Sequence, residues 1–322
     1  MCRGNLRATD QLCRKALELA TESWRLAEGQ PRWIPISEWA LAISLAAIGT
    51  FKQAKTHFEQ AIAGYHPQHP INTPLGPDLA VFSYAFEAYV VWLLGYPKQA
   101  LNHYHRAVEI AQNLQNPFNL VLAYAYGAIL HQMLQDREGV LGCARSLLEL
   151  CAKYGFVYYR DWGLILSGWA DSDTARIHQG LENLKAIRAE ARWPYFLGLL
   201  AETHWQLGQS EEARSILGAA RAMAAHREDA LWLPELHRLE GEIAGGQVAE
   251  PHFLKALEVA RAQESKSLEL RAAMSLAKLW HSQGHTQQAY ELLEPIYGWF
   301  KEGLGTKDLL QAKTLLEELS YT

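Results

Sequence analysis

The stretch VWLLGYPKQALNHYHRAVEI (Val91–Ile110) contains a glycine, Gly95, that is followed five and twelve residues later by Ala100 and Ala107. Apolar residues recur every three to four positions on both sides of the glycine, which is the period of an α-helix with one buried face. Glycine permits a sharp turn between two helices, and alanine lets two helices approach closely. The stretch therefore predicts a helical hairpin.

The same spacing recurs along the chain. Other glycines are followed by alanine five residues later, twelve residues later or both, in the sets Gly49 with Ala54 and Ala61, Gly208 with Ala213 and Ala220, Gly284 with Ala289, and Gly4 with Ala16. No segment shows a sustained period of two, which would predict strands. We predict an all-α fold: a right-handed α-solenoid of about sixteen helices, paired as hairpins that resemble the tetratricopeptide repeat.

The predicted repeats are irregular. The interval from Gly49 to Gly95 is 46 residues, whereas a tetratricopeptide repeat usually spans about 34. Ala244 replaces the turn glycine in one repeat, and the stretch Gln135–Ala170 lacks the glycine signal, so two repeats there are inferred from helical period alone. The alternative is a helical bundle without repeats, but matched offsets at four or five sites favour the solenoid.

We expect one continuous solenoid over residues 1–322. The segment 66–77 is rich in proline, which cannot continue a helix, so it is predicted to be an exposed loop between an N-terminal part, 1–65, and the remaining repeats, 78–322. Gly4 occupies the position of a turn glycine, so the chain is expected to begin in mid-repeat, with an unpartnered helix from about Ala8. Apolar surface left uncovered there predicts that another domain or subunit docks on this end.

The composition narrows the class of partner. The 322 residues carry a net charge of −5 without a run of lysine or arginine, so we expect no nucleic-acid partner. No stretch approaches the roughly 20 apolar residues that span a bilayer, and the first residues lack the apolar core of a signal peptide. We therefore expect a cytoplasmic protein without a membrane partner.

The chain lacks recognisable catalytic motifs. The four cysteines form no CxxC pair, and Gly284 interrupts the helix between His281 and His285, which argues against a zinc site. No glycine-rich phosphate-binding loop of the G-x-x-x-x-G-K-[ST] type occurs. We expect no metal, no cofactor and no catalytic residue, and hence a protein that is not an enzyme.

Several strings resemble the C-terminal tetratricopeptide-like helical region of large bacterial proteins that join a class III adenylate cyclase domain, or another N-terminal effector, to a signalling ATPase. The strings are THFEQAIAGY (Thr56–Tyr65), VWLLGYPKQAL (Val91–Leu101), NPFNLVLAYAYGAILHQ (Asn116–Gln132), RWPYFLGLLAE (Arg192–Glu202), ELHRLEGEI (Glu235–Ile243), KSLELRAAMSLAKLW (Lys266–Trp280) and LLEPIYGWFKEG (Leu292–Gly303). The resemblance covers nearly the whole chain and implies a regulatory role in signal transduction. The family's ATPase and cyclase activities are carried by domains that this sequence does not contain.

Repeat geometry predicts which side chains line a groove. In hairpins of this kind the first helix lines the concave face, at positions six and three before the turn glycine and one after it. These offsets select Tyr89, Trp92, Tyr96, Glu202, Trp205, Gln209, Arg238, Lys278, His281 and His285. The set combines aromatic rings with both charges, which suits the binding of a peptide segment or a small ligand, although packing within the core or an intrahelical pair between Arg238 and Glu242 would also explain members of it.

Three hypotheses follow for the function. The first is a non-catalytic scaffold or sensor module that binds a protein or peptide segment in signal transduction. The second is a helical repeat domain that senses a small molecule, and the third is an enzyme with an unrecognised site. The offsets and the resemblance favour the first.

Overall fold

The computed structural model describes residues 33–66, 71–73, 76–189 and 191–320, together with Gln11, Arg14, Lys15 and Glu18. This part of the chain forms fifteen α-helices and one short 3₁₀-helix, η1 (Gly246–Ala249). The α-helices are α2 (Trp33–Ala47), α3 (Phe51–Ala63), α4 (Leu79–Leu93), α5 (Pro97–Asn113), α6 (Pro117–Met133), α7 (Arg137–Tyr154), α8 (Val157–Asp171), α9 (Thr174–Ala186), α10 (Trp193–Gln206), α11 (Ser210–Arg227), α12 (Leu233–Ala244), α13 (Glu250–Ala262), α14 (Lys266–Ser282), α15 (Thr286–Gly298) and α16 (Lys307–Ser320).

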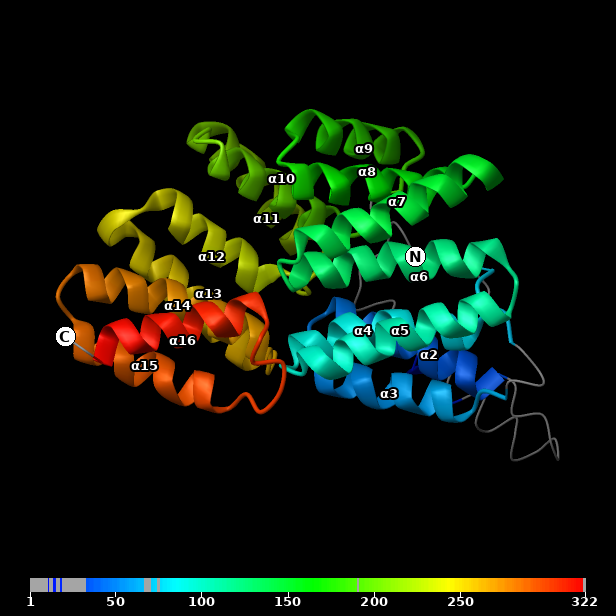
Figure 1. Cartoon of the computed structure of the whole chain (residues 1–322), viewed down its shortest axis with the longest axis horizontal. Helices are drawn as coiled ribbons and strands as arrows, with labels where there is room; N and C mark the ends of the chain where they lie inside the picture. The colour runs from blue at the N-terminus through cyan, green and yellow to red at the C-terminus, as the bar shows by residue number, and fades with distance from the viewer. Residues whose placement is uncertain are drawn as a thin grey trace.

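The helices alternate between two layers (Figure 1). Each even-numbered helix packs against the odd-numbered helix that follows it and against the next even-numbered helix, from α2 to α16. The even-numbered helices thus form an inner layer, and the odd-numbered helices cover it from outside. The predicted fold class, an all-α stack of tetratricopeptide-like hairpins, is confirmed.

The sequences of the two layers explain their places. In the inner helix α4 every residue except Tyr84 is buried, because the helix is apolar almost all round. The outer helix α5 buries a single stripe at three- to four-residue spacing: Pro97, Ala100, Tyr104, Ala107 and Ala111. An outer helix therefore needs only one apolar face, whereas an inner helix is covered by neighbours on several sides.

The alanines that follow the turn glycines lie where helices approach closely. All of the described ones are 0% exposed: Ala54, Ala61, Ala100, Ala107, Ala213, Ala220 and Ala289. Each lies on an outer helix, within its buried stripe. The offsets of the sequence therefore mark contacts between outer and inner helices.

Six turns from an inner to an outer helix share one geometry. In each, a residue one or two positions after the helix has a positive φ, and two backbone N–H groups bond back to the last helical turn, as in a Schellman C-cap. Four of these residues are glycines, Gly49, Gly95, Gly208 and Gly284, but the other two are Gln135 (φ 56°) and Ser172 (φ 58°). The two repeats without a glycine signal therefore make the same turn with polar residues.

The stack closes on itself, so that the C-terminal helices lie beside the first repeats (Figure 1). Three successive turns of the N-terminal half receive side chains from the C-terminal half. The contacts are the ion pair of Lys52 with Glu264, the hydrogen bond from Ser265 Oγ to the Leu93 carbonyl (3.2 Å), and the hydrogen bond from the Arg271 guanidinium to the Met133 carbonyl. The backbone N–H of Ala230 also donates to the Ala47 carbonyl (2.9 Å).

Some expectations fall beyond what the structure describes. The start in mid-repeat, with a helix from about Ala8 and Gly4 in its turn, lies outside the described residues. Of the proline-rich segment, residues 66, 71–73 and 76–77 are described, and Asn72 pairs with Asp78 in an isolated bridge. The division of the solenoid into an N-terminal part, 1–65, and the remaining repeats, 78–322, stays a prediction. Among the described helices, none combines the length and the apolar character that crossing a membrane requires.

Candidate binding surface on the inner layer

Charged side chains of α10, α12 and α14 meet on the inner layer. Arg238 of α12 donates to both oxygens of Glu235 (3.0 and 2.7 Å) and to Glu242 (2.9 Å). Ser275 of α14 donates to the same Glu242 carboxylate (2.6 Å). The Trp169 indole of α8 donates to Glu202 of α10 (2.8 Å). The helices are therefore bridged by polar side chains on the face that the outer layer leaves uncovered.

The carboxylates of this cluster differ in their electrostatic environment. Burial and the neighbouring charge of Glu235 raise the pKa of Glu202, and the hydrogen bond from Trp169 only partly offsets them. Glu235 is equally enclosed, but Arg238 and Arg271 outweigh the effect of burial and hold its pKa below the ordinary value. Glu202 thus accepts a hydrogen bond from the neutral indole of Trp169 (2.8 Å), whereas Glu235 forms an ion pair with Arg238 (2.7 Å).

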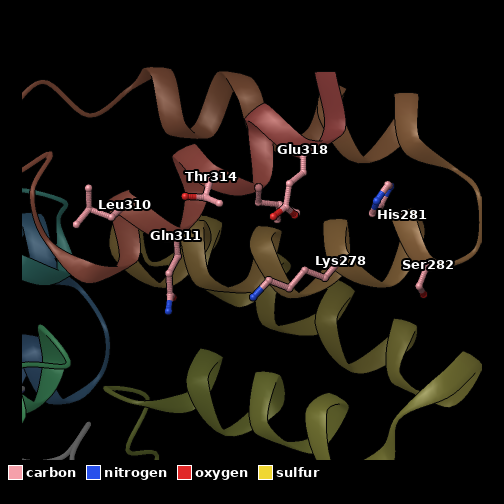
Figure 2. Close-up of a pocket in the computed structure, with 8 residues that line it drawn as sticks. Lys278, His281, Ser282, Leu310, Gln311, Thr314 and Glu318 are labelled. Carbon is pink, nitrogen blue, oxygen red and sulfur yellow. The ribbon is translucent and has the colours of Figure 1, made fainter. Parts of the chain in front are cut away.

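A groove lies between α14 and α16 (Figure 2). Its volume is about 510 Å³, and it is lined by Lys278, His281 and Ser282 from α14 and by Leu310, Gln311, Thr314, Leu315 and Glu318 from α16. Leu310 is 50% exposed, whereas Leu315 is buried and belongs to the core beneath the groove. The groove therefore offers an apolar floor with polar walls.

Three groups that line the groove are available to a ligand. Within the part of the chain that the structure describes, the side chains of Lys278, Gln311 and Thr314 make no hydrogen bond or ion pair, and all three are exposed. The ammonium, the amide and the hydroxyl can each donate a hydrogen bond. His281 is oriented by a hydrogen bond between its Nδ1 and Thr286 (3.0 Å). The groove therefore presents donors that the fold does not use.

The structure brings part of the predicted set together. Glu202 and Arg238 interact within the charged cluster, and Lys278 and His281 line the groove. Trp205 is half-buried on α10. Gln209 and His285 are exposed in the turns that follow α10 and α14, where Gln209 Oε1 bonds to His204 Nδ1 (2.6 Å).

The other predicted groove residues, Tyr89, Trp92 and Tyr96, are covered by the chain itself. Tyr89 and Trp92 are each 2% exposed. The Arg271 guanidinium lies 5.0 Å from the centre of the Trp92 ring, and the edge of the Tyr96 ring meets Trp299 at 5.4 Å between centroids. These positions face inward, as the offsets predict, but their inner side is occupied by the C-terminal half.

Tyr89 belongs to an aromatic cage around Arg192. The guanidinium of Arg192 donates to the Tyr89 hydroxyl (3.2 Å). It lies over four rings at 4.9 to 5.6 Å from their centres: Phe86, Tyr89, Tyr126 and Trp162. Stacking against aromatic faces stabilises a buried guanidinium. The cage fills the interior between α4, α6 and α8 at this end of the stack.

Sequence reasoning missed several residues of the inner face. Arg192, Arg271 and Asp308 were not selected, because none lies at the chosen offsets from a turn glycine. Gln311 and Thr314 lie on α16, after which the described residues contain no turn glycine to count from. Counting from the buried stripe of α16, which includes Leu309, Ala312 and Leu315, would have placed them beside the core and facing α14.

Comparison with known proteins agrees with this architecture. Residues 194–219, which span α10 and most of α11, match the model of the tetratricopeptide repeat. A Rap protein crystallised in complex with Competence and Sporulation Factor superposes with a TM-score of 0.60 at 13% identity, covering 98% of this chain and 96% of its own. The apo form of RapI gives 0.53 at 11% identity, with 95% and 99% covered. Aspartyl phosphate phosphatase F from Bacillus subtilis gives 0.53 at 12% identity, with 88% and 73% covered.

At these identities the similarity shows the fold, which is that of a tetratricopeptide-like helical repeat protein. No curated protein matches the sequence. Within the described residues, no group of three or more His, Cys, Asp or Glu side chains is placed to hold a metal ion. The two described cysteines of the repeats, Cys143 and Cys151, are free and buried.

Proposed function

We propose that this chain is a non-catalytic interaction module that binds a peptide segment of a partner protein in the groove between α14 and α16. The observation that carries the proposal is the exposed set of donors in that groove, Lys278, Gln311 and Thr314, above an apolar floor. Unused donors on a formed, concave surface are what a bound backbone or carboxylate would satisfy.

The chemistry of the groove indicates the kind of segment it would take. The amide of Gln311 and the hydroxyl of Thr314 can bond to the carbonyl groups of an extended peptide, and Lys278 favours an acidic side chain. Leu310 and Leu315 provide contact for one apolar side chain. The preferred ligand is therefore a short segment that carries both an acidic and an apolar residue.

A place in signal transduction is the finer part of the proposal. The resemblance to the regulatory region of cyclase-linked ATPases supports it, as does the Rap protein, which has the same fold and forms a complex with Competence and Sporulation Factor. In this role the chain would bind a signalling protein and change its activity. If the partner is an ATPase or a cyclase, adding the chain should change its turnover, and Lys278→Glu should abolish the change; unaltered turnover would remove the signalling role.

Selection from a phage-displayed peptide library on the immobilised full chain tests the binding site. Enriched peptides should bind the wild-type chain and lose at least tenfold in affinity for Lys278→Glu, because the substitution places a like charge beside an acidic ligand. The matched control is Lys313→Glu, which reverses an exposed charge on α16 that does not line the groove. Failure to enrich any peptide, or equal effects of the two substitutions, would overturn the proposal.

A further inference from the structure

The turn between α4 and α5 is held by the C-terminal unit, by which we mean residues 265–320. Ser265 Oγ donates to the Leu93 carbonyl (3.2 Å), and Ser267 Oγ donates to the Trp92 carbonyl (2.5 Å). Both carbonyls belong to the last turn of α4, and the Trp92 carbonyl also accepts from the backbone N–H of Gly95 (2.9 Å). The side chain of Trp299 packs on Gly95, where an added Cβ would lie only 2.5 Å from the ring.

The turn between α6 and α7 is held in the same manner. Arg271 donates to the Met133 carbonyl and forms an ion pair with Asp308 (2.9 Å). Asp308 in turn accepts a hydrogen bond from Gln135 Nε2 (2.7 Å). One buried arginine of α14 therefore links the end of α6 to the start of α16, and its guanidinium also covers Trp92.

The C-terminal unit retains its own core when these contacts are set aside. Its apolar side chains form a cluster with α13, which includes Leu293, Phe300, Leu309 and Leu315 and is separate from the main core of the molecule. Leu268 is the residue of the unit that belongs to the main core. Apart from Leu268, the buried apolar side chains of the unit therefore pack outside the main core.

The contacts themselves are of a kind that water can replace. Carbonyl groups at helix ends are readily hydrated, and burying an ion pair costs desolvation energy that offsets much of its attraction. Gln99 bonds to Glu302 through both its backbone N–H (3.0 Å) and its amide (3.2 Å), and this pair is already exposed. The net cost of separating the two surfaces is therefore small compared with unfolding either one.

We propose that the C-terminal unit is a releasable latch, an intramolecular contact that covers the inner face of α4 and opens to uncover Trp92 and Tyr96. In the closed state Trp92 contacts Arg271 and Tyr96 contacts Trp299, while Trp232, which lies outside the unit, packs on another side of Trp92. In the open state they line the part of the inner layer that repeat geometry assigns to ligand binding. The latch is independent of the groove between α14 and α16, which both states expose.

Hydrogen exchange of the full chain, followed by mass spectrometry, tests the latch. Trp299→Ala removes the ring from Tyr96 and Gly95, so we expect at least tenfold faster exchange in residues 92–97 and 133–137, with α14–α16 still protected. The matched control is Tyr297→Ala: both Tyr297 and Trp299 pack on the core of the unit, and of the two it is Trp299 that also contacts Tyr96 and Gly95. Tyr297→Ala should accelerate hydrogen exchange in α15 and α16 alone.

A second pair of variants changes the receiving turn and leaves the unit intact. Gly95→Ala and Gly208→Ala both place a side chain at positive φ (94° and 79°), but only at Gly95 does the added Cβ meet Trp299 and Lys266. Gly95→Ala should accelerate hydrogen exchange in residues 265–271 at least tenfold. Gly208→Ala should accelerate exchange within α10 and α11 only. If α14–α16 lose protection throughout in Trp299→Ala, or if Gly95→Ala leaves residues 265–271 unchanged, the latch proposal is wrong.

Discussion

At the scale of single residues, Glu202 shows how the inner layer holds charge. Its carboxylate accepts hydrogen bonds from Trp169 (2.8 Å) and Gln206 (3.3 Å), both neutral donors. Glu242, one helix further along, is instead paired with Arg238 at 2.9 Å. Two acidic side chains of the same face therefore differ in their partners, because only Glu242 has a cation in hydrogen-bond contact.

Replacing Glu202 with glutamine should stabilise the fold at neutral pH. Burial and Glu235 raise the folded pKa of Glu202 above its ordinary value of 4.5, so its contribution to stability is present below that pH and is lost as the pH rises through the folded pKa. Glu202→Gln avoids this loss, and we expect a gain of about 1 kcal/mol in the free energy of unfolding at pH 7. Urea denaturation at pH 7 and pH 4.5 measures it, and the gain should shrink at the lower pH.

Glu242→Gln is the matched control for that measurement. It removes a carboxylate that Arg238 and Ser275 bind, so it should lower the stability at pH 7. A gain in both variants would show that excess negative charge, and not the environment of Glu202, decides the result. A loss in both would contradict the assigned pKa shift of Glu202.

Residue roles on this face were only partly predictable from the sequence. Glu202, Arg238 and Lys278, which the offsets from turn glycines select, lie on the inner helices α10, α12 and α14; their role in binding stays a prediction. The cage around Arg192 could not be found in this way. Its four rings come from α4, α6 and α8, and they meet Arg192 only after three hairpins have packed together.

At the scale of helices, the alanine positions determine how closely an outer helix packs. Ala220 of α11 is 0% exposed, whereas the adjacent Ala219 is exposed. The backbone of α11 can approach its neighbour at Ala220 because a methyl group is the whole side chain. The sequence pattern identified such positions because every hairpin needs one at the same distance from its turn.

Ala220→Leu should therefore be destabilising, by about 1–3 kcal/mol, because the larger side chain forces the two helices apart. Ala219→Leu adds the same atoms on the solvent side of α11, and its effect should stay within about 0.5 kcal/mol. Thermal or urea unfolding of both variants checks the difference. Similar losses of stability in Ala220→Leu and Ala219→Leu would mean that close helix packing does not explain the distance between glycine and alanine that recurs along this chain.

The turns were predicted where they contain glycine and missed where they do not. Gln135 and Ser172 also adopt a positive φ (56° and 58°), at the turn position that Gly95 and Gly284 occupy elsewhere. The left-handed conformation costs such residues about 1 kcal/mol, which the two capping hydrogen bonds and the packing of the flanking helices offset. A glycine pattern therefore underestimates the number of repeats wherever a polar residue is tolerated.

At the scale of the whole molecule, the stack is closed by contacts between its two halves. The sequence could not show this closure, because the path of a solenoid depends on small rotations that accumulate over every repeat. The intervals between equivalent turn positions are unequal, from 46 residues between Gly49 and Gly95 to 36 between Ser172 and Gly208, so no single repeat geometry extrapolates to the whole. Closure explains why Trp92 and Tyr96 are covered while Lys278 and His281 remain on an open groove.

Zero-length crosslinking with a carbodiimide measures that closure most directly. Lys52 and Glu264 form an ion pair, and their side chains are 65% and 51% exposed, so the reagent can reach them. We predict an amide link between the peptides that contain Lys52 and Glu264, in monomeric protein, which Lys52→Ala abolishes. The adjacent pair of Lys55 and Glu59 serves as the internal control. If Lys55 and Glu59 become linked while Lys52 and Glu264 do not, the repeats form an open stack and the closed arrangement is contradicted.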